Sequence, residues 1–285
     1  MMEQKQTRYH VRYEPPRGFS PIDFSELIRY KDLIWLFVKR DFTVMYKQTV
    51  LGPAWILISP LMTTLMYTVM FGNIASLPTN GVPQLAFYMA GTALWTFFST
   101  CVNKVSGTFT ANAGIFSKVY FPRLTMPLST MLSAAINFLV QFVLLLCIMA
   151  FYLVGGRISP QWELWVLLPL VLLQVGLLGL GCGVIVSSLT TRYRDLAVVV
   201  TFGVQLWMYA TPVVYPMSMI TDARLRLALS LNPMTAAMES FRRILFGSGQ
   251  VSVMGWGIAI AETLALLVLG ASLFSKVEKT FVDTV

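Results

Sequence analysis

Hydrophobic residues are gathered into long uninterrupted runs, and polar residues are confined to the segments between them. The clearest run is 48–103, where no Asp, Glu, Lys or Arg occurs. A membrane-spanning helix needs roughly 20 apolar residues, so this run is long enough for two, and the turn-rich stretch 72–84 (GNIASLPTNGVPQ) divides them. The whole pattern predicts six spans, at residues 53–73, 84–104, 124–154, 164–190, 196–216 and 251–275.

An amphipathic pattern precedes the first span. Its apolar positions step by three and four, and they are Phe24, Leu27, Ile28, Trp35, Val38, Phe42 and Met45. Basic residues occupy the other faces of the same helix. A basic amphipathic helix with Trp and Phe on its apolar face is expected to lie in the headgroup plane of a membrane. We therefore predict a cytoplasmic tail and interfacial helix in residues 1–50, and a six-helix transmembrane domain in residues 51–285.

A second amphipathic helix is predicted at residues 233–246, before the last span. Asn232 is a helix cap, Pro233 suits the first helical position, and Gly247 ends the helix. The pattern places Glu239 on a polar face, where it can pair with Arg242 and Arg243. Together these features predict an interfacial or re-entrant helix on the outer side.

Composition supports an all-α integral membrane protein. The 285-residue chain has a mean hydropathy of +0.69, and only 12% of its residues are charged, whereas a soluble domain carries about 25%. Sixteen of the 21 Lys and Arg residues fall on one side if both termini are cytoplasmic, as the positive-inside rule favours. Topology thus explains the net charge of +8, and we expect no nucleic-acid partner.

The chain lacks the sequence signatures of catalysis. It has a single histidine, His10, and no nucleophile elbow, zinc motif or phosphate-binding loop. The glycine-rich stretch 176–183 (GLLGLGCG) lies inside a span and predicts close helix packing. Glu262 is the one carboxylate deep within a span, and either a functional or a structural role is open to it. We expect no catalytic residue, metal or cofactor on this chain, and an energy source on another subunit.

Aromatic residues line the outer halves of three predicted spans. A glycan offers C–H faces that stack on aromatic rings, so these side chains are candidates for lining a pore: Tyr67, Tyr88, Trp95, Trp207, Tyr209 and Tyr215.

Five loop sequences occur in order along the chain, at 40–55 (RDFTVMYKQTVLGPAW), 115–127 (IFSKVYFPRLTMP), 191–196 (TRYRDL), 231–247 (LNPMTAAMESFRRILFG) and 276–285 (KVEKTFVDTV). Together they resemble one family, the type-2 ABC exporter permeases of O-antigen, capsule and teichoic-acid systems. Hydropathy alone indicates only a membrane protein, whereas this ordered series indicates a family.

The resemblance implies the membrane subunit of an exporter in the bacterial inner membrane. It implies a homodimer, two copies of a cytoplasmic ABC ATPase that hold ATP and Mg²⁺, and a polyprenyl-diphosphate-linked glycan as cargo. Arg40 and Lys47 would meet the lipid phosphate. A coupling helix at about 112–122 would contact the ATPase through Ile115, Phe116, Ser117, Lys118, Val119, Tyr120, Phe121, Pro122 and Arg123.

Two other functions are compatible with the sequence. A type-2 ABC permease for drugs or small lipids would share the fold. A membrane-embedded glycosyl- or acyltransferase would act on the same lipid-linked sugars, but it would need acidic or histidine residues that are scarce here.

Overall fold

The computed structural model describes residues 24–47, 51–116, 121–191, 193 and 195–281, and these residues form helices joined by turns and loops. The predicted all-helical class is confirmed for this part of the chain. The helices are α1 (Phe24–Arg29), α2 (Lys31–Tyr46), α3 (Trp55–Tyr67), α4 (Gln84–Ser106), α5 (Thr108–Phe116), α6 (Thr125–Val154), α7 (Leu168–Thr190), α8 (Leu196–Tyr209), α9 (Ala223–Ser230), α10 (Pro233–Phe246) and α11 (Val253–Phe281).

Five helical segments within the described residues are long and apolar enough to cross a membrane: Gly52–Ile74, Gln84–Ser106, Thr125–Val154, Trp162–Thr190 and Val253–Val277. The first includes α3, a short 3-10 helix at Gly52–Ala54 and a π-helical turn at Thr68–Ile74. The predicted span at 196–216 differs, because α8 ends at Tyr209 and residues 210–216 are not helical. Pro212 and Pro216 remove two backbone donors there, so a regular helix cannot continue through this stretch.

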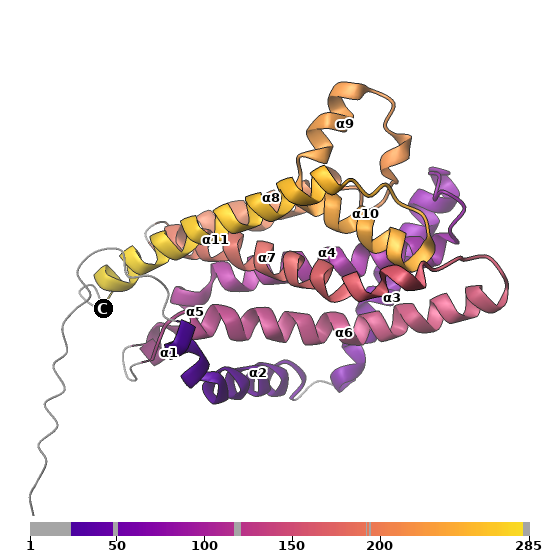
Figure 1. Cartoon of the computed structure of the whole chain (residues 1–285). Coiled ribbons are helices and arrows are strands. Elements are labelled where there is room, and N and C mark those ends of the chain that lie inside the picture. Colours follow the sequence, from indigo (N-terminus) through magenta and orange to yellow (C-terminus); the bar gives the residue numbers. More distant parts are fainter. Residues whose placement is uncertain (1–23, 48–50, 117–120, 192, 194, 282–285) are drawn as a thin grey trace, which may run out of the picture.

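Helix α4 lies at the centre of the bundle. It packs against α7, α6 and α3, and 78% of its most apolar stretch is buried, against 6% for the segment that contains α3. Aromatic rings fill the space around it, including Phe98, whose ring meets Trp207 of α8 edge-on at 5.1 Å. In Figure 1, α11 and α8 lie above α4 and α7, while α6 and α2 lie below them.

Small residues allow α7 to approach its neighbours closely. A Cβ atom on Gly179 would lie 2.6 Å from Cys101 Cβ of α4, and one on Gly183 would lie 2.6 Å from Val105 Cβ. On the other side of α7, Gly181 faces the backbone of α11 at Leu266. The stretch predicted to pack closely therefore does so on two faces, in the manner of small-residue contacts between membrane helices.

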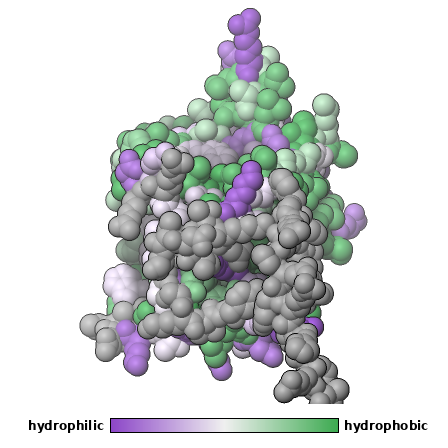
Figure 2. All heavy atoms as spheres, turned by 90° about the vertical axis from the view of Figure 1, so that its left-hand side faces the viewer, coloured by the Kyte–Doolittle hydropathy of each residue, from purple (hydrophilic) through white to green (hydrophobic). Residues whose placement is uncertain are grey.

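The surface of the bundle is largely apolar. Figure 2 views the chain from the end that carries α1, α5 and the last turns of α11, which is the left-hand end of Figure 1, and hydrophobic residues cover its flanks. Helix α9 stands off the bundle at the top of both views. Helix α2 packs along α6, and its Phe37 is buried there. Such a surface suits a lipid solvent better than water.

Replacing Gly183 with valine tests the α4–α7 contact. We expect Gly183→Val to lower the free energy of unfolding by about 2 kcal/mol, because the added carbons overpack the interface with Val105. Gly203→Val is the matched control, since a Cβ atom on Gly203 of α8 meets nothing within 4 Å. Thermal unfolding of the detergent-purified protein measures both, and an equal loss in the two variants would contradict the interpretation.

Candidate functional site

A buried arginine holds the irregular segment that follows α8. Arg242 of α10 is only 1% exposed. Its guanidinium donates hydrogen bonds to the carbonyl oxygens of Pro212 (2.6 Å), Val213 (2.6 Å) and Tyr215 (3.2 Å). The same group lies 3.8 Å from the centre of the Phe87 ring of α4. The guanidinium thereby satisfies carbonyls of the irregular segment that have no partner in a helix.

Glu239, one turn earlier on α10, balances this charge. Its carboxylate lies 3.6 Å from the Arg242 guanidinium, and it accepts hydrogen bonds from the backbone N–H of Gln250 (2.9 Å) and of Met217 (3.4 Å). Burial lowers the pKa of the Arg242 guanidinium to about 10, and the Glu239 carboxylate opposes that shift. Arg242 therefore stays protonated at neutral pH, and the pair ties α10 to the segments on both sides of it.

The amino terminus of α10 is fixed to the same segment. The Asn232 side chain caps the helix by accepting from the Met234 N–H at 3.0 Å, and it donates to the carbonyl oxygen of Ala210 and the hydroxyl of Thr211, both at 2.9 Å. On the α4 side, a Cβ atom on Gly91 would lie 2.5 Å from the Val213 carbonyl oxygen. Glycine is thus required where the irregular chain crosses α4.

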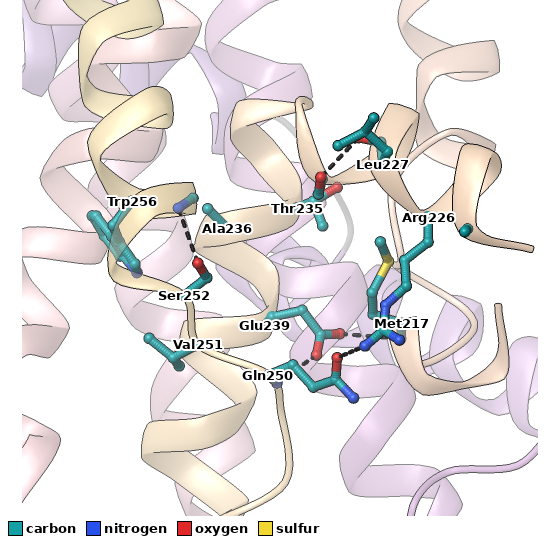
Figure 3. Close-up of a pocket in the computed structure, with 13 residues that line it drawn as sticks. Met217, Arg226, Leu227, Thr235, Ala236, Glu239, Gln250, Val251, Ser252 and Trp256 are labelled. Carbon is teal, nitrogen blue, oxygen red and sulfur yellow. Dashed lines mark hydrogen bonds between the residues drawn. The ribbon is translucent and has the colours of Figure 1, made fainter. Parts of the chain in front are cut away.

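A pocket of about 490 Å³ opens between α9, α10 and α11. Arg226, Glu239 and Gln250 face one another across it (Figure 3), and the Arg226 guanidinium donates to the Gln250 side chain. Trp256 forms part of the wall, with its indole N–H donated to Ser240. These polar groups are bonded to one another or to neighbouring backbone groups, so they hold the pocket wall together.

The predicted coupling segment lies partly outside the described residues, which do not include Ser117, Lys118, Val119 and Tyr120. Helix α5 covers the preceding part, through Ile115 and Phe116, and Pro122 is half-buried in the turn before α6. The Phe121 ring lies 5.6 Å from Phe116 and 5.7 Å from Phe37 of α2. The Arg123 guanidinium lies 5.6 Å from the centre of the Phe116 ring.

Phe121, which the family resemblance places in the ATPase contact, is buried within this chain. It is 4% exposed and belongs to an apolar cluster with Phe37 and Met126. The physical reason is that α2 packs against α6 and covers this side of the loop. Phe121 therefore joins α2 to the loop and to α6.

The two cations predicted to meet a lipid phosphate lie on the second half of α2 and directly after it. Arg40 pairs with the neighbouring Asp41 at 2.8 Å, and its guanidinium lies 4.9 Å from the centre of the Phe37 ring. Lys47 is exposed where the helix ends.

The six aromatic candidates separate into two groups. Tyr88 and Trp95 of α4 are buried in the core, so within a single chain they offer no surface to a pore. The other four lie on α3, on α8 and in the segment after α8: Tyr67, Trp207, Tyr209 and Tyr215. The Tyr67 hydroxyl donates to the Met208 sulfur at 3.7 Å, and the Tyr215 hydroxyl donates to the Tyr209 carbonyl oxygen at 3.0 Å. Contacts between α3 and α8 therefore bring this group together.

Glu262 is half-buried on α11, and its Oε2 atom has no hydrogen-bond partner in the described part of the chain. The next residue, Thr263, accepts a hydrogen bond from Gln174 of α7 at 3.4 Å. The carboxylate thus lies beside a polar contact between two helices without joining it.

Two features of the structure were not predicted, and one residue was predicted in the wrong place. Helix α9 was not predicted, although Asp222 is a visible cap that accepts from the Arg224 and Leu225 N–H groups. A stripe of threonines on α4 was also missed. Arg242 was expected on an outer polar face, and this was wrong. Its pairing with Glu239 occurs, but both side chains are buried.

Comparison with known proteins matches residues 32–246 to a family described as ABC-2 type transporter. The chain is 28% identical over 264 residues to the O-antigen export system permease protein RfbA of Myxococcus xanthus, covering 91% of this chain and 98% of that one. It is 27% identical over 253 residues to an O-antigen export system permease protein RfbA of Klebsiella pneumoniae, covering 88% and 94% of the two chains.

Arg242 and the adjacent Arg243 give a matched test of the buried hydrogen bonds made by Arg242. We expect Arg242→Gln to lower the free energy of unfolding by about 3 kcal/mol, because it leaves the Glu239 carboxylate and several carbonyls without their partner. Arg243→Gln removes an exposed guanidinium one position away and should change stability little. Thermal unfolding in detergent distinguishes them, and equal midpoints for the two variants would refute the role given to Arg242.

Proposed function

The chain belongs to the ABC-2 type transporter family, and we propose that it is the membrane subunit of an exporter that carries a lipid-linked polysaccharide across the bacterial inner membrane. The observation that carries this proposal is the likeness over about nine-tenths of the chain to relatives named as O-antigen export permeases. Such a cargo is large and amphipathic, so it needs a path that accepts both sugars and an isoprenoid tail.

Six crossings with both termini in the cytoplasm complete the proposed topology. The five long helices supply five of them, and α8 together with the irregular residues 210–216 supplies the other. An interrupted crossing is tolerated in a membrane where its backbone groups are satisfied by protein. The carbonyls bound by Arg242 meet that condition. Helix α10 then lies on the outer side, and α2 lies at the inner surface.

A second copy of the chain is proposed to cover α3 and α8. Both helices expose large apolar side chains, with Met62 and Met66 on α3 and Val198 and Phe202 on α8 at least 57% exposed. Tyr67, Trp207, Tyr209 and Tyr215 lie at the same side. A homodimer joined there would place these aromatic groups beside a central pore, where sugar rings can stack on them.

Two copies of a cytoplasmic ABC ATPase are proposed to drive transport, with ATP and Mg²⁺ bound to that partner. The α5–α6 end is suited to receive the motion, because Phe121 connects the loop to α2 and α6 at once. A shift at residues 117–120 would thereby move a helix of the bundle together with the interfacial helix. Arg40 and Lys47 of α2 would meet the lipid phosphate at the same surface.

Deletion of the gene in the producing bacterium tests the export function. We expect surface polysaccharide to disappear and the lipid-linked glycan to accumulate inside, with both restored by the tagged protein. The tagged protein should co-purify with an ABC ATPase. Normal surface polysaccharide in the deletion strain would refute the cargo, and transport without any ATPase partner would refute the mechanism.

Alanine substitutions at Tyr120 and Phe121 distinguish a loss of ATPase coupling from a loss of stability. We expect Tyr120→Ala to reduce export about tenfold while leaving protein level and thermal stability unchanged, since loss of one docking aromatic weakens a partner contact by about 2 kcal/mol. Phe121→Ala should instead destabilise the protein by about 3 kcal/mol, because its ring is buried against Phe37. Full export by the Tyr120 variant would count against its place in the ATPase contact.

Glu262→Gln tests whether the carboxylate in α11 has a transport role. The proposed mechanism draws its energy from ATP, so we expect export and assembly to be unchanged when the amide replaces the carboxyl at nearly constant volume. Export is measured as surface polysaccharide per copy of protein. Loss of export in a normally assembled Glu262→Gln protein would show that the carboxylate takes part.

A further inference from the structure

Three helices present polar side chains to a single groove. On each helix these polar residues are four positions apart, so they lie on one face. They line a cavity of about 290 Å³ and are Ser59 and Thr63 of α3, Thr92, Thr96, Thr100 and Lys104 of α4, and Asn137 and Gln141 of α6. Spacing by four on all three helices makes this a continuous polar surface between apolar spans.

The groove extends from one end of the bundle into its interior. Lys104 lies in the last turn of α4, at the end of the bundle that carries α5. Thr92 lies twelve residues earlier, and at about 1.5 Å per residue the stripe is about 18 Å long. Under the proposed topology it begins at the inner membrane surface and reaches past the middle of one leaflet.

A buried amide in the groove lacks a partner. Gln141 is 6% exposed, and its Oε1 atom makes no hydrogen bond within the described residues. An unsatisfied buried polar group costs about 1–3 kcal/mol, so this atom points to a ligand that donates to it. Thr92, by contrast, already donates to the Tyr88 carbonyl at 2.9 Å and meets the Thr64 hydroxyl at 3.2 Å.

The surroundings show that the polar surface is local. Leu139 lies on the side of α6 turned away from Asn137 and is 50% exposed, and Trp55, one turn before Ser59 on α3, is 48% exposed. Apolar surface therefore adjoins the polar groove. A molecule that fits both surfaces has a polar head and a long apolar tail.

We propose that this groove binds the phosphate and first sugar of the lipid-linked glycan, an inference that rests on the function proposed above. Threonine hydroxyls and carboxamides both donate and accept hydrogen bonds, as the hydroxyl groups of a sugar require. The Lys104 ammonium is suited to a phosphate. Trp55, Phe97 and Phe138 also line the cavity, and their rings can pack on sugar C–H faces. The isoprenoid tail extends from the groove into the surrounding hydrocarbon.

Photo-crosslinking of the purified full-length protein tests this site. A benzophenone side chain is introduced at Thr96, which is exposed to the groove. The protein is placed in nanodiscs of phosphatidylethanolamine and phosphatidylglycerol with polyprenyl-diphosphate-linked N-acetylglucosamine labelled in the sugar. We expect a labelled adduct that excess unlabelled lipid-linked sugar removes. The matched control at Leu139 should give adducts with phospholipid and none with the labelled sugar.

Substitutions at Lys104 test the phosphate contact. Lys104→Gln should lower the labelled adduct about tenfold, as loss of a charge-assisted hydrogen bond predicts. Lys104→Arg keeps the charge and should stay within about twofold of the unsubstituted protein. Gln141→Leu, which removes the unpartnered oxygen, should also lower the adduct.

Two outcomes would overturn the proposal. Adducts at Thr96 with phospholipid alone would make the groove a general lipid contact, and cross-linked pairs of the protein would make it an interface between copies. Both outcomes are independent of the export function, because deletion of the gene tests that function separately. Loss of surface polysaccharide on deletion, with no labelled adduct at Thr96, would refute the groove and leave the exporter standing.

Discussion

The end of the bundle that carries α9 and α10 depends on one buried cation. Arg242 carries a charge into the core, and the carbonyl oxygens of Pro212, Val213 and Tyr215 accept its hydrogen bonds. A helix that stops inside a membrane leaves carbonyls that no lipid can satisfy. The guanidinium supplies several donors in a fixed plane, which a lysine cannot do. Helix α8 can therefore end at Tyr209, because α10 presents the donors that the missing helical turn would have supplied.

The same arrangement determines the shape of the surrounding site. Glu239 neutralises Arg242 and also accepts from the backbone of Met217 and Gln250, so α10 is fixed to the chain before it and after it. The pocket between α9, α10 and α11 takes its wall from this fixed frame. On the far side, Gly91 lets the irregular segment pass against α4. Helix α10 and the irregular segment after α8 thus hold each other in place through buried polar groups.

Hydropathy predicted the helical class and the five long helices, because membrane crossing requires long apolar runs. Periodicity failed for Arg242, because it assigns a charged side chain to the face away from the apolar one. The partners of Arg242 lie about 30 positions earlier in the sequence, and local patterns do not contain them. The burial of Phe121 is also absent from the local sequence pattern, since the ring that covers it belongs to α2.

The strength of its hydrogen bonds limits whether a polar side chain can bind a cargo that has to move on. Arg242 and Glu239 are held by short, charged hydrogen bonds, so they form a fixed frame and are poorly suited to carry a moving ligand. The hydroxyls along α4 are uncharged and exchange partners at little cost, since a neutral hydrogen bond contributes only about 1 kcal/mol net. A sugar can therefore move from one threonine to the next without being trapped. Under the proposed function, the cargo would move along these weak contacts, Arg242 and Glu239 would hold α10 and its neighbours in place, and the ATPase would act at the opposite end, where Phe121 joins the loop to α2 and α6.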